Sequence, residues 1–272
     1  MRPYGLPQQD GNGGFLRRGY GIIHCLLLET SDGLTLVDTG WGTRDCMAAT
    51  PAVRQFAGVV RSSLDLEETA VHQLRKLGYG IPDVKHIFLT HLHLDHAGGL
   101  PDFPLATVHV SARELEAFSH PRTLVERRAY RLEHTAHSPR WQVHDTRGAR
   151  WFGLEAASPT EVGGSEIVFV PMPGHTRGHC ALAVRAGDRW LLHCGDSYGY
   201  YRQADPVQPY AYPNGRLMEW AVTAGFSMPR RHWRVIRQLR REHGDVISAF
   251  CSHDAHEFAA ARAEQWGALA TR

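Results

Sequence analysis

The chain of 272 residues has few cysteines and no long apolar run. Its five Cys are odd in number and irregularly spaced, which argues against a disulfide framework and favours a reducing compartment. No apolar stretch approaches the length needed to cross a bilayer, which argues against a membrane partner. Residues 1–14 carry Pro, Gln and Gly where a secretion signal needs an apolar segment. We therefore expect a cytoplasmic protein.

The chain also lacks a strong net charge, a long linker and an internal repeat. A formal charge of +2 is too small to indicate a nucleic-acid partner by itself. Arginines do gather in residues 113–150 and 230–241, but solvated helix faces explain such groups more often than anion sites. With 43% apolar residues the chain can bury one sizeable core, so we predict a single domain over 1–272. An exposed apolar patch could serve a homodimer.

What the chain does contain is a dense motif of metal-binding side chains. His91, His93, Asp95 and His96 lie within six residues, directly after an apolar stretch. With 18 His in the chain, such a match arises by chance with a probability of roughly 0.4%. Imidazole and carboxylate groups bind zinc, iron and manganese, and alternate residues at a strand end point the same way. The pattern predicts a metal site; the alternative is a polar loop without a ligand.

Three more polar residues follow apolar, strand-like stretches. His175 comes after residues 167–170, Asp196 after 189–192 and His253 after 246–251. In layered α/β folds, functional side chains gather on loops at one edge of a sheet. We therefore expect these residues to converge with the first motif.

Together these motifs resemble those of the metallo-β-lactamase superfamily. The resemblance rests on HLHLDH at 91–96, GHTRGH at 174–179, GDS at 195–197, SHD at 252–254 and the early LVDTG at 36–40. It implies an α/β fold, the αββα four-layer sandwich, made of two halves that face each other. It also implies two divalent metal ions, with zinc favoured and iron, manganese or cobalt as alternatives.

The resemblance further implies a role for each matching residue. His91, His93 and His175 would bind one ion, Asp95, His96 and His253 the other, and Asp196 would bridge the two. His179 would be a hydrogen-bonding residue or would orient a ligand. The remaining histidines near the motifs are read as ordinary ones: His24, His86, His109, His193 and His256.

Such a site would catalyse hydrolysis. A metal-bridging hydroxide would attack an acyl carbonyl, and Asp95 would accept a proton and return it to the leaving group. Tyr198 is the candidate for a hydrogen bond to the oxyanion. The N-acyl-homoserine lactonases of the superfamily carry a Tyr three residues beyond the bridging Asp, whereas Gly199 occupies that place here and Tyr198 lies one residue earlier.

Among the branches of the superfamily, the lactonase-like one fits best. Asp196 and the missing leader argue against a true β-lactamase, and the 19 residues after His253 leave little room for the helical segment of glyoxalase II. The expected substrate is a small molecule: a lactone such as an N-acyl homoserine lactone, or a related ester or thioester. The alternatives are a phosphodiesterase or nuclease, a persulfide dioxygenase-like iron enzyme and a non-catalytic metal-binding module.

Local patterns add expectations about the fold. Residues 22–28 and 34–37 predict a hairpin about Ser31-Asp32-Gly33, and 65–77 predict an amphipathic helix. Ser111 and Glu114 resemble a capping box, in a segment of about 111–150 that we read as a helical or irregular insertion over the site. An apolar groove for an acyl chain could draw on Phe103, Leu105, Phe118, Phe226 and Met228, although core packing explains them as well.

Overall fold

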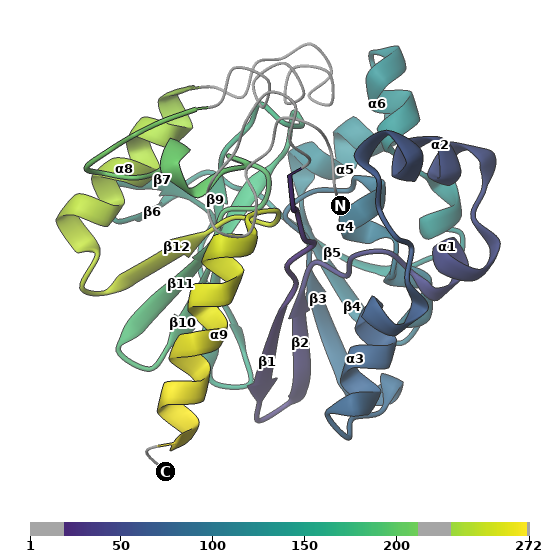
Figure 1. Ribbon diagram of the computed structural model, residues 1–272, viewed down its shortest axis with the longest axis horizontal. Helices are drawn as coiled ribbons and strands as arrows, with labels where there is room; N and C mark the ends of the chain where they lie inside the picture. Colours follow the sequence, from purple (N-terminus) through teal and green to yellow (C-terminus); the bar gives the residue numbers. More distant parts are fainter. Residues whose placement is uncertain (1–18, 212–229, 271–272) are drawn as a thin grey trace.

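The computed structural model describes residues 19–211 and 230–270, which form two five-stranded sheets placed face to face (Figure 1). The first sheet has the order β1 (Leu26–Thr30), β2 (Gly33–Val37), β3 (Val84–Phe88), β4 (Thr107–Ser111) and β5 (Arg140–His144). The second has the order β12 (Ile247–Phe250), β11 (Arg189–His193), β10 (Cys180–Ala186), β9 (Ser165–Pro171) and β8 (Thr160–Val162). A separate hairpin is formed by β6 (Ala149–Trp151) and β7 (Leu154–Ala156).

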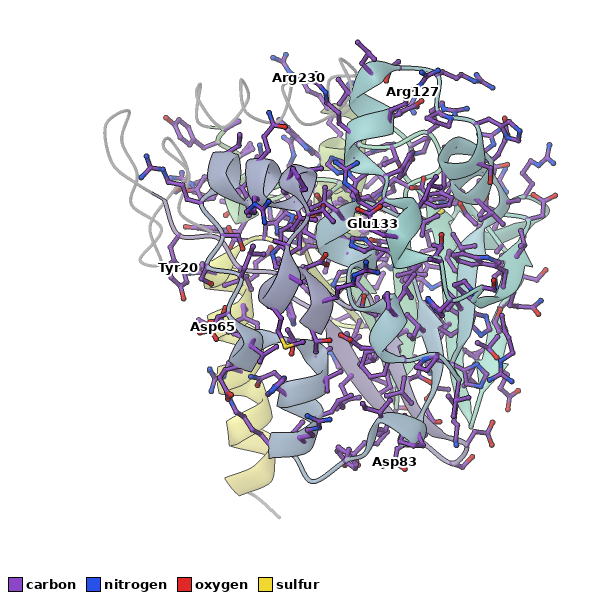
Figure 2. The ribbon with its side chains drawn as sticks, turned by 90° about the vertical axis from the view of Figure 1, so that its right-hand side faces the viewer. Tyr20, Asp65, Asp83, Arg127, Glu133 and Arg230 are labelled. Carbon is purple, nitrogen blue, oxygen red and sulfur yellow. The ribbon has the colours of Figure 1, made fainter. Side chains whose placement is uncertain are left out.

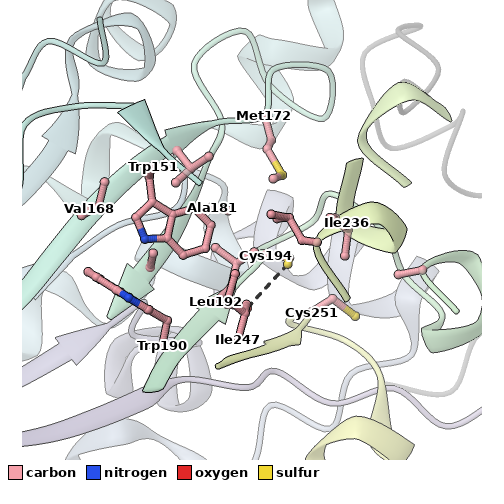
Figure 3. Close-up of a cluster of buried hydrophobic side chains, with 14 of the residues drawn as sticks. Trp151, Val168, Met172, Ala181, Trp190, Leu192, Cys194, Ile236, Ile247 and Cys251 are labelled. Carbon is pink, nitrogen blue, oxygen red and sulfur yellow. Dashed lines mark hydrogen bonds between the residues drawn. The ribbon is translucent and has the colours of Figure 1, made fainter. Parts of the chain in front are cut away.

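Strand β9 shows how the second sheet is buried on both faces. Ile167 and Phe169 belong to the core between the two sheets, where they meet Phe88 of β3. Val168 and Val170, which point the other way, join the core beneath α8 (Arg230–His243). Figure 3 shows that second core, with Trp190, Leu192 and Ile247 of the sheet close to Ile236 of the helix. A continuous apolar run is what a strand covered on both faces requires.

The outer face of the first sheet is covered by helices of the N-terminal half. Val71 and Leu74 of α3 (Ala70–Lys76) and Phe118 of α5 (Ala112–Ser119) share a core with Leu36 and Val108. The order helix, sheet, sheet, helix is the expected αββα sandwich.

The remaining helices are α1 (Thr43–Ala48), α2 (Pro51–Val60), α4 (Leu94–Ala97), α6 (Leu124–Ala129) and α9 (Ala255–Ala270), with 3-10 turns η1 (Leu66–Glu68), η2 (Ile81–Asp83), η3 (Leu100–Asp102), η4 (Leu132–His134) and η5 (Tyr201–Gln203).

The local expectations are mostly confirmed, with three differences. The hairpin of β1 and β2 turns at Ser31-Asp32, as predicted, but its first strand starts only at Leu26. The helix expected over 65–77 is split into η1 and α3, because Thr69 has an extended backbone. Ser111 caps α5 by accepting from the Glu114 amide, whereas the Glu114 side chain bonds elsewhere, so the capping box is only half formed.

The segment 111–150 is not wholly an insertion. Strand β5 falls inside it and pairs in parallel with β4, so residues 140–144 are part of the first sheet. Helix α6 and η4 lie between the two strands, and Tyr130 at the end of α6 forms a bridge with His93. This segment therefore contacts the histidine motif. Within the described ranges, none of the helices has both the length and the apolar character that a bilayer crossing needs.

Candidate metal centre

Three histidines from two loops form the first part of the site. His91 and His93 follow β3, and His175 follows β9. The ring centroids of His91 and His175 are 4.7 Å apart, and those of His93 and His175 are 4.6 Å apart. All three side chains are buried, and one ring nitrogen of each lies within 4.8 Å of the others. The spacing is suited to a single metal ion.

A second group lies beside the first and shares Asp196 with it. Asp95 and His96 begin α4, and His253 follows β12. The Nε2 atom of His253 is 3.7 Å from Asp95 Oδ2, and His96 Nε2 is 3.9 Å from Asp95 Oδ1. Asp196 places Oδ2 3.2 Å from Nε2 of both His175 and His253, and Oδ1 3.4 Å from His96 Nε2. The structure thus brings all seven predicted ligands together, with Asp196 between the two groups.

The unpaired atoms of this cluster fit a pair of cations. Among the residues that the structure describes, four buried atoms of the cluster have no hydrogen-bond partner: His91 Nε2, His96 Nε2, His175 Nδ1 and Asp196 Oδ1. Leaving buried polar atoms unpaired is costly, and native proteins rarely do so. Imidazole nitrogens and carboxylate oxygens are also the donors that borderline divalent ions prefer. The donor set is therefore the right one for divalent metal ions.

The protonation states point the same way. Burial, together with neighbouring histidines, lowers the pKa of His91 and of His93 well below the usual value. Burial also lowers the pKa of His175. Burial opposes ionisation of Asp196, but His253, His96 and His175 outweigh it and hold the pKa of that carboxyl well below its usual range. The three-histidine group thus offers neutral imidazoles and Asp196 an ionised carboxylate, which is the state that binds a metal. Burial lowers the pKa of His96 and of His253 as well, but nearby carboxylates, Asp196 foremost, outweigh it and raise both, so a metal ion would displace a proton from each ring.

Asp38 supports the cluster from behind and was missed as a site residue by the sequence reasoning. Its Oδ2 lies 2.8 Å from His96 Nδ1, while Thr90 donates its amide to Oδ1 and its hydroxyl to Oδ2. Such a carboxylate fixes the ring orientation and tautomer of a ligand histidine. A signal was present, since Asp38 directly follows an apolar strand, like the other site residues. Its backbone φ of 56° is one that Asp tolerates better than most residues.

His179 holds the backbone that carries Asp196. Its Nε2 accepts a hydrogen bond of 2.9 Å from the Asp196 amide, and its Nδ1 lies 3.1 Å from the Met172 carbonyl oxygen. The Nδ1 atom must therefore carry the proton. A Cβ on Gly195 would lie 2.5 Å from His179 Nε2, and its φ is +52°, so this turn requires glycine. His179 thus orients the loop of Asp196.

The segment before β1 orients His253. His253 Nδ1 lies 2.7 Å from the Ile22 carbonyl oxygen, so Nδ1 donates and Nε2 faces Asp196. The amides of Ile22 and His24 donate in turn to the carbonyl oxygens of His253 and Ser252. Residues 22–24 were read as strand, and they serve as a short backbone support for the late histidine.

The structure corrects the position expected for Tyr198. Its side chain is fully buried in the core beneath α8, and its hydroxyl bonds to Glu257 and to Arg240 Nη2. The hydroxyl is thus occupied by an internal ion pair and is not directed at the histidine cluster. Tyr198 therefore packs in the core and is not part of the histidine cluster.

Other predicted residues lie in the core or outside the described ranges. Phe103 and Phe118 belong to the core of the first sheet, while Leu105 is 63% exposed. Phe226 and Met228 fall in residues 212–229, outside the described residues. His86, His109 and His144 form a hydrogen-bonded row across β3, β4 and β5, with 3.0 Å between successive ring nitrogens. That row lies apart from the seven predicted ligands.

A comparison of the sequence with protein families now identifies the fold family. Residues 18–221 match the model of the metallo-beta-lactamase superfamily. The chain belongs to this superfamily. The family membership agrees with the αββα sandwich and with the position of the histidine cluster at the strand ends.

Sequence relatives of this superfamily member are hydrolases by name. A probable metallo-hydrolase of Mycobacterium tuberculosis is 41% identical over 241 residues, which cover 89% of this chain and 77% of the relative. An N-acyl homoserine lactonase of a Bacillus species is 35% identical over 99 residues, covering 36% of this chain and 40% of that protein. The lactonase similarity is thus confined to part of the chain.

Solved structures show the same fold at low sequence identity. A variant of AiiA from Bacillus thuringiensis, with N-decanoyl-L-homoserine at its active site, superposes with a TM-score of 0.60 at 22% identity, covering 91% of this chain and 86% of that one. A probable metal-dependent hydrolase from Staphylococcus aureus gives 0.62 at 17% identity, with coverage of 93% and 86%. AidC, a dizinc quorum-quenching lactonase, gives 0.54 at 19% identity, with coverage of 90% and 76%.

Proposed function

We propose that this metallo-hydrolase uses two divalent ions, with zinc as the favoured metal, to hydrolyse a lactone or a related ester. The observation that carries the proposal is the pair of ligand groups that meet at Asp196. A structural zinc site is usually closed by four ligands, whereas two adjoining groups with a shared carboxylate are typical of catalytic dinuclear sites. This argues against a purely metal-binding module.

In this proposal His91, His93 and His175 hold one ion, and Asp95, His96 and His253 hold the other. Asp196 contacts residues of both groups and would fix their separation. Two ions in this arrangement would supply a nucleophile from water near neutral pH and stabilise charge on the attacked carbonyl oxygen. The surrounding residues orient the candidate ligands: Asp38 bonds to His96, the Ile22 carbonyl to His253, and His179 to the backbone of Asp196.

Asp95 is the proposed proton carrier. Its two carboxylate oxygens face different histidines, His96 and His253, at 3.9 and 3.7 Å. It is 5% exposed, so it touches solvent while remaining part of the cluster. A carboxylate in this position can take a proton from the attacking water and return it to the leaving oxygen of an opened ring.

The choice of a lactone is supported by the relatives. Named lactonases appear among both the sequence relatives and the structural neighbours, and one of those neighbours is a dizinc enzyme. The seven candidate ligands include no separate nucleophilic side chain, so the nucleophile would be water, which can open a lactone ring. Arg127 and Arg230 lie at one end of the molecule in Figure 2. Because arginine side chains bind phosphate, phosphodiesters are tested beside the lactones.

The test combines metal analysis with substrate assays on the purified protein. We expect about two equivalents of divalent metal per chain and turnover of N-acyl homoserine lactones or simpler γ-lactones, lost on chelation and restored by zinc. The panel includes thioesters, bis-p-nitrophenyl phosphate and a β-lactam. Faster turnover of the phosphodiester would replace the lactone with that substrate class. A folded protein without bound metal would reject the metallo-hydrolase itself.

A further inference from the structure

Glu114 is a buried carboxylate that lies outside the seven ligands. It sits in the first turn of α5, is 0% exposed, and accepts four hydrogen bonds. The Leu92 amide and the Tyr130 hydroxyl donate to Oε1 at 2.9 and 3.1 Å. The Thr176 hydroxyl and the Gly178 amide donate to Oε2 at 2.6 and 3.2 Å.

Three of these donors come from the two loops that carry the three-histidine group. Leu92 stands between His91 and His93, and Thr176 directly follows His175. One oxygen of Glu114 thus holds the first loop and the other oxygen holds the second. Tyr130 adds a further link to the first loop, because its backbone forms a bridge with His93.

The second loop is also fitted closely to the start of α5. A Cβ on Gly178 would lie 2.0 Å from the Glu114 amide nitrogen, and Ser111 donates its hydroxyl to the Gly178 carbonyl oxygen at 2.8 Å. The helix and the loop therefore cannot shift independently. Glu114 thus contacts both histidine loops at once, in addition to the direct bond between the Cys180 amide and the Thr90 carbonyl oxygen.

Only a carboxylate satisfies all four partners. Each partner donates, and a carboxylate has acceptor sites on both oxygens and no proton to give. A glutamine has one carbonyl oxygen, so its amide group would face the Gly178 amide or the Leu92 amide, donor against donor. The glutamine could accept both hydrogen bonds on its oxygen side. On its amide side it could bond only to a hydroxyl, that of Tyr130 or Thr176, after that hydroxyl had rotated to accept. Four donors also offset part of the cost of burying the charge.

The other ligand group is supported by different residues. Asp38 bonds to His96 and the Ile22 carbonyl bonds to His253, while within the described part of the chain no side-chain hydrogen bond of Glu114 reaches Asp95, His96 or His253. The two halves of the centre thus have separate supports. A substitution at Glu114 should therefore affect the support of the three-histidine group and not that of the other group.

We propose that Glu114 is a positioning residue that sets the distance between the His91–His93 loop and the His175 loop, and so sets the metal affinity of the three-histidine site selectively. The inference rests on the proposed dinuclear centre. It concerns the metal and not the substrate, so it holds for any substrate of the panel. Outer partners of ligand residues typically change metal affinity ten- to a hundredfold.

The test uses three variants of the full chain. Glu114→Gln keeps the size of the side chain and removes its ability to accept from both loops. Thr176→Val removes one donor on the second loop and leaves Glu114 in place, so it serves if Glu114→Gln folds poorly. Glu116→Gln is the control on the same helix, because Glu116 lies two residues further along with its side chain 55% exposed. It pairs with Arg122 at 3.2 Å and reaches the second loop only through a weaker pair with Arg177 at 3.8 Å.

Cobalt(II) titration of the metal-free proteins, followed by visible absorption with a competing chelator, reports both the affinity and the coordination of each site. For Glu114→Gln we expect one of the two binding steps to weaken ten- to a hundredfold, with an altered absorption band, and the other to stay within about threefold. Thr176→Val should weaken the same step by a smaller factor. Glu116→Gln should match the unmodified protein.

Three results would overturn the inference. The first is unchanged cobalt affinity and spectrum in both Glu114→Gln and Thr176→Val. The second is equal weakening of both steps together with a lower melting temperature of the metal-free protein, which indicates a general structural role. The third is an unmodified chain that binds no cobalt, which would reject the proposed function as well. Binding of two cobalt ions without lactone turnover would reject only the substrate class.

Discussion

The Nδ1 atom of His96 lies 2.8 Å from Oδ2 of Asp38, and both side chains are buried. Burial lowers the pKa of His96, but the carboxylates of Asp196, Asp38 and Asp95 outweigh it and raise that pKa well above its usual value. A metal ion at Nε2 would take the place of one proton, and the Nδ1 proton would remain on the bond to Asp38. Asp38 therefore belongs to the proposed centre although it does not touch the ions.

Asp38→Asn should lower metal affinity ten- to a hundredfold at the site that holds His96. Asparagine tolerates the φ of 56°, so the backbone can be kept while the charge is lost. Its amide group would face either His96 Nδ1 or Thr90, both of which need an acceptor. Chelator competition measures the change, and the exposed Asp188→Asn is the control. Equal affinities in the two variants would contradict this role.

Asp95→Asn should reduce lactone turnover by two to four orders of magnitude, about the range of general acid–base catalysis. The variant keeps an oxygen that can face His253 and loses the basic carboxylate. We expect a native circular dichroism spectrum. Metal analysis must accompany the kinetics, because a variant that had merely lost an ion would regain activity at high zinc. Near-normal kcat would reject proton transfer by Asp95.

Tyr198→Phe should leave kcat within about threefold and lower the free energy of unfolding by about 1–3 kcal/mol. The hydroxyl bonds to Glu257 and Arg240, which form a partly buried ion pair between α9 and α8. Removing it leaves these charged groups short of a partner without changing any of the seven candidate ligands. Urea denaturation and steady-state kinetics separate the two effects. A large fall in kcat with unchanged stability would return Tyr198 to the active site.

The cluster of seven candidate ligands could be predicted from the sequence because each of these residues follows an apolar strand. Parallel strands β2 and β3 end at one edge of the first sheet, and β11 and β12 end at the same edge of the second. Local residue types therefore predicted a three-dimensional cluster. The αββα class followed from the same motifs through the family they resemble.

Glu114 shows why the supports were harder to predict. Its spacing from Ser111 indicated a capping box, and the short-range part of that prediction is confirmed. Its four partners lie 16 to 64 residues away in the chain, so local pattern could not reveal them. The prediction for Tyr198 was wrong for the opposite reason. Tyr198 is close to Asp196 in the sequence, but the turn at Gly195 and Asp196 directs the two side chains to different sides.

Gly178→Ala should lower the free energy of unfolding by at least ~2 kcal/mol, because the added methyl group would meet backbone atoms of Arg113 and Glu114, which cannot move aside as a flexible side chain could. Gly58→Ala is the matched control. A Cβ at Gly58, inside α2, meets nothing within 4 Å, so that change should stabilise the protein by about 0.5–1 kcal/mol. Chemical denaturation measures both. Similar effects of the two substitutions would mean that the loop does not fit against α5 as closely as the structure shows.

His109→Asn should make the protein less sensitive to acid. Burial, aided by His144 and His86, lowers the pKa of His109 to about 3, from 6.5 in an unfolded chain. Between these values the unfolded state binds a proton that the folded state excludes, so stability is full above pH 6.5 and falls as the pH drops toward 3. The slope from this one group approaches about 1.4 kcal/mol per pH unit.

The variant also loses the ring stacked 4.0 Å from Phe88, so the slope of stability against pH is the quantity to compare, not its absolute value. Urea denaturation at pH 7.5, 6.0, 5.0 and 4.5 gives that slope, and His256→Asn, at an exposed position on α9, is the control. We expect a flatter slope only in His109→Asn. Parallel slopes in all three proteins would show that the row of His86, His109 and His144 takes up protons without unfolding.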